Sequence, residues 1–148
     1  YFWVSDYVIQ QADVKADLAR LGECVSAVGH TVLLMEPWHA PDPLTCAYCI
    51  AEVYHTQRSG AQFDMVMSSA QQAKLETALL TDFYSIQASL SKVDVRIATC
   101  RKEEDRKAIL DELEQGVGVV ACNALVIGLL REALLARVLA YHALQGEF

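Results

Sequence analysis

The sequence predicts a three-layer α/β domain with a mostly parallel sheet and a helical carboxyl-terminal extension. Short apolar runs rich in aromatic and β-branched residues alternate with longer stretches in which apolar residues recur every three or four positions. Strands that alternate with helices of this length indicate βαβ units, in which right-handed crossovers connect parallel strands. The chain has 148 residues, of which 53% are hydrophobic, so we expect one domain with a sizeable core.

The first strand and the first helix are expected before residue 29. Tyr1 to Ser5 is an apolar run with three aromatic residues, and Asp6 to Gln11 would form the loop at its carboxyl end. From Ala12 a helical spacing continues to Gly29, and glycine is a common residue at the end of a helix. The apolar stripe of this helix consists of Val14, Leu18, Leu21, Val25 and Val28.

The next two strands flank a helix that carries several polar residues. Thr31 to Glu36 is an apolar run between a glycine and a proline, which is typical of a parallel strand covered on both faces. Leu44 to Gln57 is predicted to be a helix, and Phe63 to Met67 is predicted to be the third strand. The residues of this helix that should be buried are Ala47, Ile50, Val53 and Tyr54.

Beyond the third strand the pattern becomes mainly helical. Apolar residues from Leu75 to Val93 follow one helical face, which is either continuous or broken near Thr81 and Asp82. Val95 to Thr99 is interpreted as a short edge strand or as a connector. Another helix is predicted from Glu103 to Gln115.

The last predicted helix begins after Gly116 and continues to about Leu144. We therefore divide the chain into an α/β domain at residues 1–115 and a long helix at residues 116–148, packed on that domain or on a partner. The first half of this helix is uncharged, but a membrane-spanning helix needs about 20 apolar residues, and charges begin here at Arg131. A buried or partner-facing helix is expected instead, without a membrane.

Charge and cysteine content restrict the partners and the compartment. The net charge is −7 and the pI is near 5.0, and the basic residues are mostly scattered. Because binding to nucleic acid or to an anionic membrane needs a basic surface, we expect neither partner. Five cysteines without a disulfide-rich spacing fit a reducing compartment, so a cytoplasmic location is expected. The chain begins inside a predicted strand, which suggests a piece of a longer polypeptide.

The second strand and its helix resemble those of TIR domains. The helix signature of TIR domains is Ser-x-Trp-Cys-x-x-Glu-Leu, and here it is Thr45-x-x-Tyr48-Cys49-Ile50-Ala51-Glu52-Val53. The stretch from Tyr1 to about Asp105 is more similar still to the TIR-like domains of large algal and protist proteins that carry ankyrin, tetratricopeptide or kinesin-light-chain-like repeats. The shared blocks are Tyr1-Phe2-Trp3-Val4, Gln10-Gln11, Gly29-His30-Thr31, Pro43-Leu44-Thr45 and Asp82-Phe83-Tyr84-Ser85-Ile86.

This resemblance implies a TIR/flavodoxin-like fold whose first strand precedes Tyr1, so that part of the ligand pocket lies outside this chain. It implies a signalling or assembly module that associates with itself or with other TIR-like domains, beside repeat domains in the same polypeptide. The alternative is NAD hydrolysis or cyclisation by Glu52, which matches the catalytic glutamate of active TIR domains. A carboxylate beside the ribose can stabilise the oxocarbenium-like transition state of that reaction. NAD would then be the substrate, and no cofactor would be required.

The NAD pocket would lie beyond the carboxyl ends of the strands, where open α/β sheets bind ligands. Trp38 could stack on a base or on nicotinamide, Asp6 could line the pocket, and Tyr48 with Cys49 would support the helix face that carries Glu52. Simpler interpretations are a packing tryptophan, an aspartate that caps a turn and a solvated glutamate. Since Tyr48 replaces the usual tryptophan, and many TIR domains lack NAD cleavage, assembly is the preferred interpretation.

The pair Cys46-x-x-Cys49 suggests a metal site or a redox site. Structural zinc normally has four ligands, and no second pair with suitable spacing is present, so we expect no metal. A thioredoxin-like site would begin a helix directly after a strand, whereas this pair is expected within the helix. We therefore interpret both residues as half-buried thiols, and Cys24, Cys100 and Cys122 as core residues.

Overall fold

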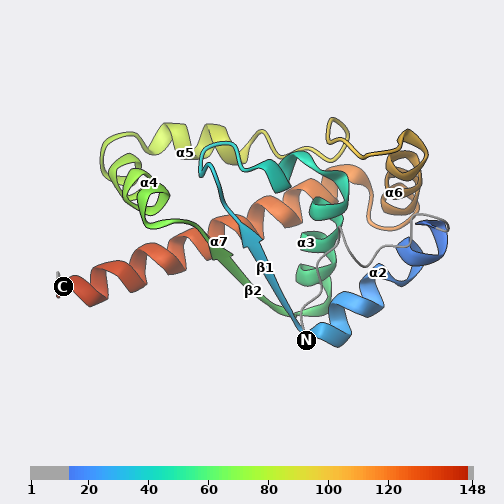
Figure 1. Cartoon of the computed structure of the whole chain (residues 1–148), viewed down its shortest axis with the longest axis horizontal. Helices are drawn as coiled ribbons and strands as arrows, with labels where there is room; N and C mark the ends of the chain where they lie inside the picture. Colours follow the sequence, from blue (N-terminus) through green and yellow to red (C-terminus); the bar gives the residue numbers. More distant parts are fainter. Residues whose placement is uncertain (1–13, 147–148) are drawn as a thin grey trace.

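The computed structural model describes residues 14–146, which form helices around a small parallel sheet (Figure 1). The predicted strand Tyr1 to Ser5 and the following loop with Asp6 lie outside the described residues. The elements in chain order are α2 (Val14–Val28), β1 (His30–Leu34), the 3-10 helix η1 (Asp42–Thr45), α3 (Ala47–Ser59), β2 (Gln62–Val66), α4 (Ser69–Thr81), α5 (Phe83–Leu90), α6 (Glu103–Gln115) and α7 (Val119–Gln145).

Within the described range the sheet has two strands, β1 and β2, which pair in parallel with Leu33 opposite Met65. Parallel pairing through α3 confirms the predicted βαβ unit, whereas the three-layer arrangement is not established by these two strands. Leu33 and Met65 are buried on the face that packs against the helices. The other face is partly open, with Val32 and Leu34 about half exposed at 53% and 48%. The expectation of a strand covered on both faces is therefore wrong for the described part of the chain.

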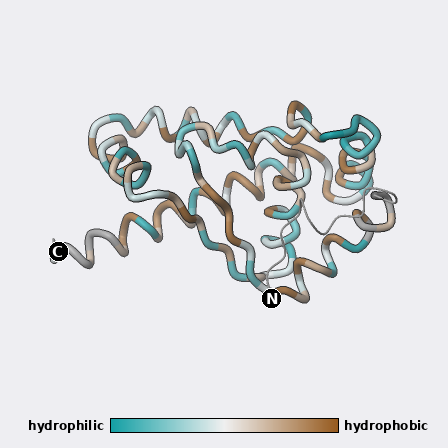
Figure 2. Tube along the Cα trace, viewed as in Figure 1, coloured by the Kyte–Doolittle hydropathy of each residue, from teal (hydrophilic) through white to brown (hydrophobic). Residues whose placement is uncertain are grey.

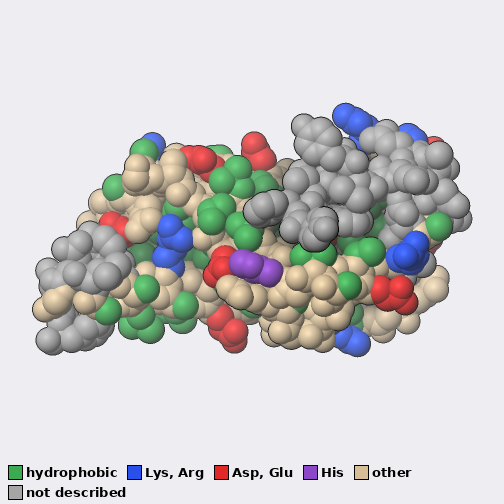
Figure 3. Space-filling model, turned by 60° about the horizontal axis from the view of Figure 1, so that its bottom comes forward, with side chains coloured by type: hydrophobic (Ala, Val, Ile, Leu, Met, Phe, Trp, Pro, Cys, Tyr) green, Lys and Arg blue, Asp and Glu red, His purple; other side chains and the backbone are tan. Residues whose placement is uncertain are grey.

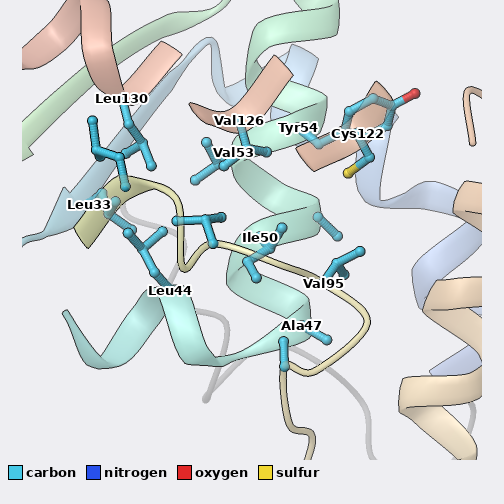
Figure 4. Close-up of a cluster of buried hydrophobic side chains, with 14 of the residues drawn as sticks. Leu33, Leu44, Ala47, Ile50, Val53, Tyr54, Val95, Cys122, Val126 and Leu130 are labelled. Atoms are coloured by element: carbon cyan, nitrogen blue, oxygen red, sulfur yellow. The ribbon is translucent and has the colours of Figure 1, made fainter. Parts of the chain in front are cut away.

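Helix α3 is at the centre of the fold and contacts α2, α6, α7 and both strands. The four residues predicted to be buried on it are all buried, which confirms the helical periodicity, and Figure 4 shows Val53 and Tyr54 beside Val126 and Cys122 of α7. Thr56 is a buried polar residue on the same helix. Its hydroxyl donates to the carbonyl of Glu52 at 2.7 Å, and the hydroxyl of Thr31 on β1 lies 2.7 Å away. These contacts fix the helix against the strand without leaving the hydroxyl unsatisfied.

The apolar face from Leu75 to Val93 is divided between two helices, so of the two alternatives the break near Thr81 and Asp82 is the one observed. Asp82 caps the second helix, because its carboxylate accepts a hydrogen bond from the backbone N–H of Ser85 at 3.1 Å. Helix α6 has the predicted bounds. Its hydrophilic first turn appears in Figure 2 and carries three acidic residues, which interact favourably with the positive end of the helix dipole.

Helix α7 has 27 residues and belongs to the same core as the elements before residue 116. It buries Cys122, Val126, Leu130 and Leu134 against α3 and its neighbours. Arg137 attaches the second half of the helix to the sheet region, because its guanidinium donates to the carbonyl of Met65 and to the side chain of Gln72, each at 2.8 Å. The carboxyl-terminal end of α7 extends past the other described elements (Figure 1).

The segment between α5 and α6 is a connector that returns to the start of α3. Thr99 makes one isolated parallel bridge with Cys46, so the alternative of an edge strand is reduced to a single residue pair within the described range. The backbone N–H of Thr99 donates to the carbonyl of Thr45 at 2.8 Å, and its carbonyl accepts from Ala47 at 2.9 Å. Asn123 of α7 holds the same connector through the backbone N–H of Val95, at 3.0 Å.

Candidate functional site

The carboxyl ends of β1 and β2 bring together four polar groups from two segments. Ser68, the residue that caps α4, donates its hydroxyl to the carboxylate of Glu36 after β1. The backbone N–H of Trp38 donates to the side chain of Gln71 at 3.2 Å. Sequence reasoning selected Trp38 here but missed Glu36, Ser68 and Gln71. Their position in the sequence could have identified them, since each follows one of two adjacent parallel strands, and such sheets bind ligands beyond the carboxyl ends of their strands.

Trp38 lies at this edge in a partly buried position and packs against the hydrophobic core. Its ring meets the ring of His39 edge to face, with centroids 5.6 Å apart and an interplanar angle of 78°. Both observations agree with the interpretation of Trp38 as a packing residue that leaves part of its ring accessible. The structure places this tryptophan with Gln71 of α4.

Glu52 lies on the second turn of α3 and is partly buried. Its charge acts on Cys46 at the start of the same helix. Tyr48 and Cys49 lie on the preceding turn, and Tyr48 packs against the core. The structure therefore groups Glu52, Tyr48 and Cys49 around the amino-terminal end of α3. Trp38 is not part of this group, because its contacts described above lie at the carboxyl ends of β1 and β2.

The Cys46-x-x-Cys49 pair is at the start of α3, and the prediction that it lies within the helix is wrong. Cys46 is the residue before the first helical residue and has an extended backbone, with φ −102° and ψ 124°. The reason is its bridge to Thr99, because a residue paired with another extended segment cannot also have helical dihedral angles. Both cysteines are half-buried, as expected.

Two of the cysteines around this helix start, Cys46 and Cys100, have pKa values shifted in opposite directions. The pKa of Cys46 is lowered to about 6, first by a hydrogen bond from the Cys49 side chain and then by the backbone N–H groups of Cys49 and Tyr48. Partial burial and the charge of Glu52 oppose this shift. Burial raises the pKa of the Cys100 thiol to about 11, and the negative charge of Cys46 adds to that effect. These shifts favour the thiolate form of Cys46 and the protonated form of Cys100.

A second titratable pair joins α3 to α6. The ring of His55 lies 3.6 Å from the carboxylate of Glu112, and it contacts Tyr54 edge to face with centroids 5.0 Å apart. Burial lowers the pKa of His55 and raises the pKa of Glu112, since desolvation disfavours the charged form of each group. The ring also approaches Gly22 of α2 so closely that a Cβ at position 22 would lie 2.8 Å from Nδ1. This cluster holds three helices together.

Metal binding has no support between residues 14 and 146, where no group of three or more His, Cys, Asp or Glu side chains is arranged to hold an ion. The absence of a metal, expected from the missing second cysteine pair, stays a prediction.

An apolar groove lies between α4 and α7. Its walls are formed by Leu75, Leu79 and Leu80 of α4 and by Arg137 and Val138 of α7. Neither Glu52 nor Trp38 lines it, so the groove is separate from both predicted site features. Comparison with protein-family models, with curated proteins and with solved structures finds no match to this chain. The function is accordingly inferred from the residues of the chain itself.

Proposed function

We propose that this chain is a TIR-like signalling or assembly module that associates with a second copy of itself through the carboxyl-terminal half of α7. The supporting observation is a pair of exposed leucines on that helix. Leu135 is 53% exposed and Leu139 is 59% exposed. They are four residues apart, so they lie on the same face of the helix, one turn from each other.

The position of these leucines favours contact with a partner over exposure of this end of the helix to solvent. The opposite face of α7 is anchored by buried Leu134 and by Arg137, which orients the exposed face outward and limits its motion. Leu80 of α4, 78% exposed, lies beside the same half of α7 at the rim of the groove. Two helices that pack through such apolar ridges remove this surface from water in both copies, at about 25 cal/mol per Å².

Exposed apolar side chains also occur on the face of the molecule shown in Figure 3, among separated acidic and basic groups. The net charge of −7 makes two copies repel each other. Because salt screens that repulsion, self-association through leucines should become stronger as ionic strength rises. Association through ion pairs would respond in the opposite way.

Helix α7 has a second property that the test must separate from assembly. Its segment Val119–Ala140 is long and apolar enough to cross a membrane, and 28% of that window is buried in the structure. The bond from Arg137 to Met65 and the buried residues on this helix favour a soluble partner, because insertion into a bilayer would break these contacts. Vesicle binding is therefore an outcome of the experiment that would contradict the proposal.

The test is light scattering over a wide concentration range, at low and at moderate salt. We expect the wild-type protein to form dimers as its concentration rises, and the double variant Leu135→Glu, Leu139→Glu to remain monomeric. Val120→Glu is the matched control, because Val120 is also apolar and 74% exposed but lies about 22 Å away along the same helix. A wild-type protein that stays monomeric throughout, or that is recovered with neutral lipid vesicles, would refute assembly through α7.

The finer fold is part of the same proposal. We propose that β1 and β2 belong to a three-layer, TIR/flavodoxin-like sheet extended by further strands, in a cytoplasmic protein that carries repeat domains. The parallel pairing of β1 with β2 through α3 supports this, since such sheets are built from βαβ units. Other TIR-like domains are then further candidate partners.

NAD cleavage by Glu52 is the second candidate, favoured by the partly buried position of this carboxylate near the start of α3. Incubation of the assembled full-length domain, which includes the strand expected before Tyr1, with NAD, followed by measurement of nicotinamide, separates the two functions. If the protein is only an assembly module, it releases none. Release that Glu52→Ala abolishes and Glu76→Ala retains would make it an enzyme, because Glu76 is likewise partly buried but lies on α4.

A further inference from the structure

The groove between α4 and α7 is apolar and small. Leu75 and Leu79 of α4 form one wall, and Val138 of α7 lines the other side. The groove encloses about 40 Å³. A single water needs about 10–15 Å³, and an apolar cavity of about 150 Å³ holds benzene. The groove therefore has room for about three or four carbon atoms, which suits one branched aliphatic side chain and is too small for a ring or a lipid chain.

The exposed leucines of α7 lie beside this groove. Leu139 directly follows Val138, which lines the groove, and Leu135 is one helical turn earlier. Leu139 remains 59% exposed, so it does not fill the groove of its own copy. The carboxyl-terminal end of α7 extends past the other described elements, which leaves a partner room to approach (Figure 1). Because leucine and groove are neighbours, a two-fold axis beside them places each leucine at the groove of the other copy.

The charges around the groove and around the leucines complement each other. Glu76 and Arg137 line the groove, and Arg131 and Glu132 are exposed one turn before the first leucine. In the part of the chain that the structure describes, none of these four residues forms an ion pair. A second copy can therefore bring its arginine to Glu76 and its glutamate to Arg137. Such exposed pairs determine orientation more than affinity, so association should still become stronger as salt screens the net repulsion.

We propose that Leu139 of a second copy occupies the groove between α4 and α7, and that two copies exchange this contact reciprocally about a two-fold axis. The inference rests on the proposed self-association and adds the surface that receives the exposed leucines. It differs from packing of the two leucine pairs against each other, because in that arrangement the wall of the groove on α4 takes no part. Occupation of the groove gives the leucine apolar neighbours from two helices of the partner.

The first measurement blocks the groove and leaves the leucines of α7 unchanged. Leu79→Trp fills the space with a larger side chain, and Leu80→Glu places a charge on an exposed residue that lines the groove. Both variants should be monomeric in light scattering at concentrations where the wild-type protein is dimeric. Thr77→Glu is the matched control, because Thr77 is exposed on α4 but does not line the groove. This control should dimerise like the wild-type protein.

The second measurement mixes two variants that lack different halves of the contact. Leu79→Trp retains the leucines of α7, while the double variant Leu135→Glu, Leu139→Glu retains the groove. An equal mixture should form a one-to-one complex that is at least about tenfold weaker than the wild-type dimer, because one of the two leucine contacts remains. Packing of the leucine pairs against each other predicts no complex in this mixture.

The outcomes separate this inference from the proposed function. If the wild-type protein dimerises but Leu79→Trp dimerises equally well, or if the mixture stays monomeric, the groove is not the acceptor and self-association stands alone. If the wild-type protein is monomeric at every concentration, both proposals fail. Circular dichroism shows whether Leu79→Trp keeps its fold. If it does not, Leu80→Glu takes its place in the mixture, because a residue that is 78% exposed tolerates a charge.

Discussion

Substitution Asn123→Ala should strongly destabilise the fold, because this one side chain joins α7 to the connector that reaches the start of α3. Asn123 is 9% exposed. Its Oδ1 accepts the backbone N–H of Val95 at 3.0 Å, and its Nδ2 donates to the carboxylate of Asp94 at 2.8 Å. Alanine removes both partners at once and provides no replacement for either.

The expected loss of stability follows from the two groups that lose a hydrogen-bond partner. The N–H of Val95 belongs to a residue that is 0% exposed, so the loss of its acceptor costs about 1–3 kcal/mol. The carboxylate of Asp94 keeps its bonds to Arg96, so the second loss is smaller, about 1 kcal/mol. The sum is about 2–4 kcal/mol, which for a chain of this size lowers the thermal midpoint by about 6–12 °C.

The assay is thermal and urea unfolding of Asn123→Ala beside two controls. Arg96→Ala removes an exposed ion pair to Asp94 and should cost less than about 1 kcal/mol. Asn123→Asp keeps an acceptor for Val95 but places a second carboxylate against Asp94, so its loss of stability should diminish as the pH falls and the carboxylates become protonated. A thermal midpoint for Asn123→Ala that equals that of Arg96→Ala would refute the role of this bond pair.

Two further outcomes are expected from unfolding measurements. Gly22→Ala should destabilise the protein although alanine favours helices, because its Cβ would lie 2.8 Å from the ring of His55. In a His55→Ala background the same change should stabilise the protein by up to about 1 kcal/mol. A change of the same sign in both backgrounds would contradict the steric explanation. Hydrogen bonds, chiefly from Arg96, hold the pKa of Asp94 well below its usual range. The stability that the ionised carboxylate contributes is therefore complete above about pH 4 and is lost as the pH falls toward the lower pKa of the folded state. Urea unfolding near pH 3 should therefore reduce the stability difference between the wild-type protein and Asp94→Asn relative to pH 7, and a difference independent of pH would exclude this linkage.

The sequence predicted elements whose residues repeat with a regular period. The helix Glu103–Gln115 has the bounds expected, and the two described strands are displaced from their predicted positions by one or two residues at their ends. A break near Thr81 and Asp82 was one of two alternatives, and the structure shows Asp82 capping the second helix there. In each case the information is local, since the spacing of apolar side chains and the chemistry of a cap depend on a few neighbouring residues.

The start of α3 could not be predicted, because a distant segment determines it. The helix begins at Ala47, three residues after the predicted start, since Thr45 and Cys46 are held in place by Thr99. Thr45 and Thr99 are 54 positions apart, and no local pattern signals their pairing. The same contact moves the cysteine pair to the end of the helix, where its chemistry differs from that of thiols in a helix interior. The candidate site is therefore a product of tertiary structure.

The connector between α5 and α6 links the stability of the fold to the chemistry at the start of α3. Asn123 holds one end of this segment on α7, and the guanidinium of Arg106 donates to the carbonyl of Ala98 at 2.9 Å near the other end. Directly after these anchors the carbonyl of Thr99 accepts the N–H of Ala47, which fixes the start of α3. The start of α3 thus depends on a connector that α7 and α6 hold from opposite sides. Since α7 is also the helix with exposed leucines, a second copy bound there would contact the element that holds this connector in place.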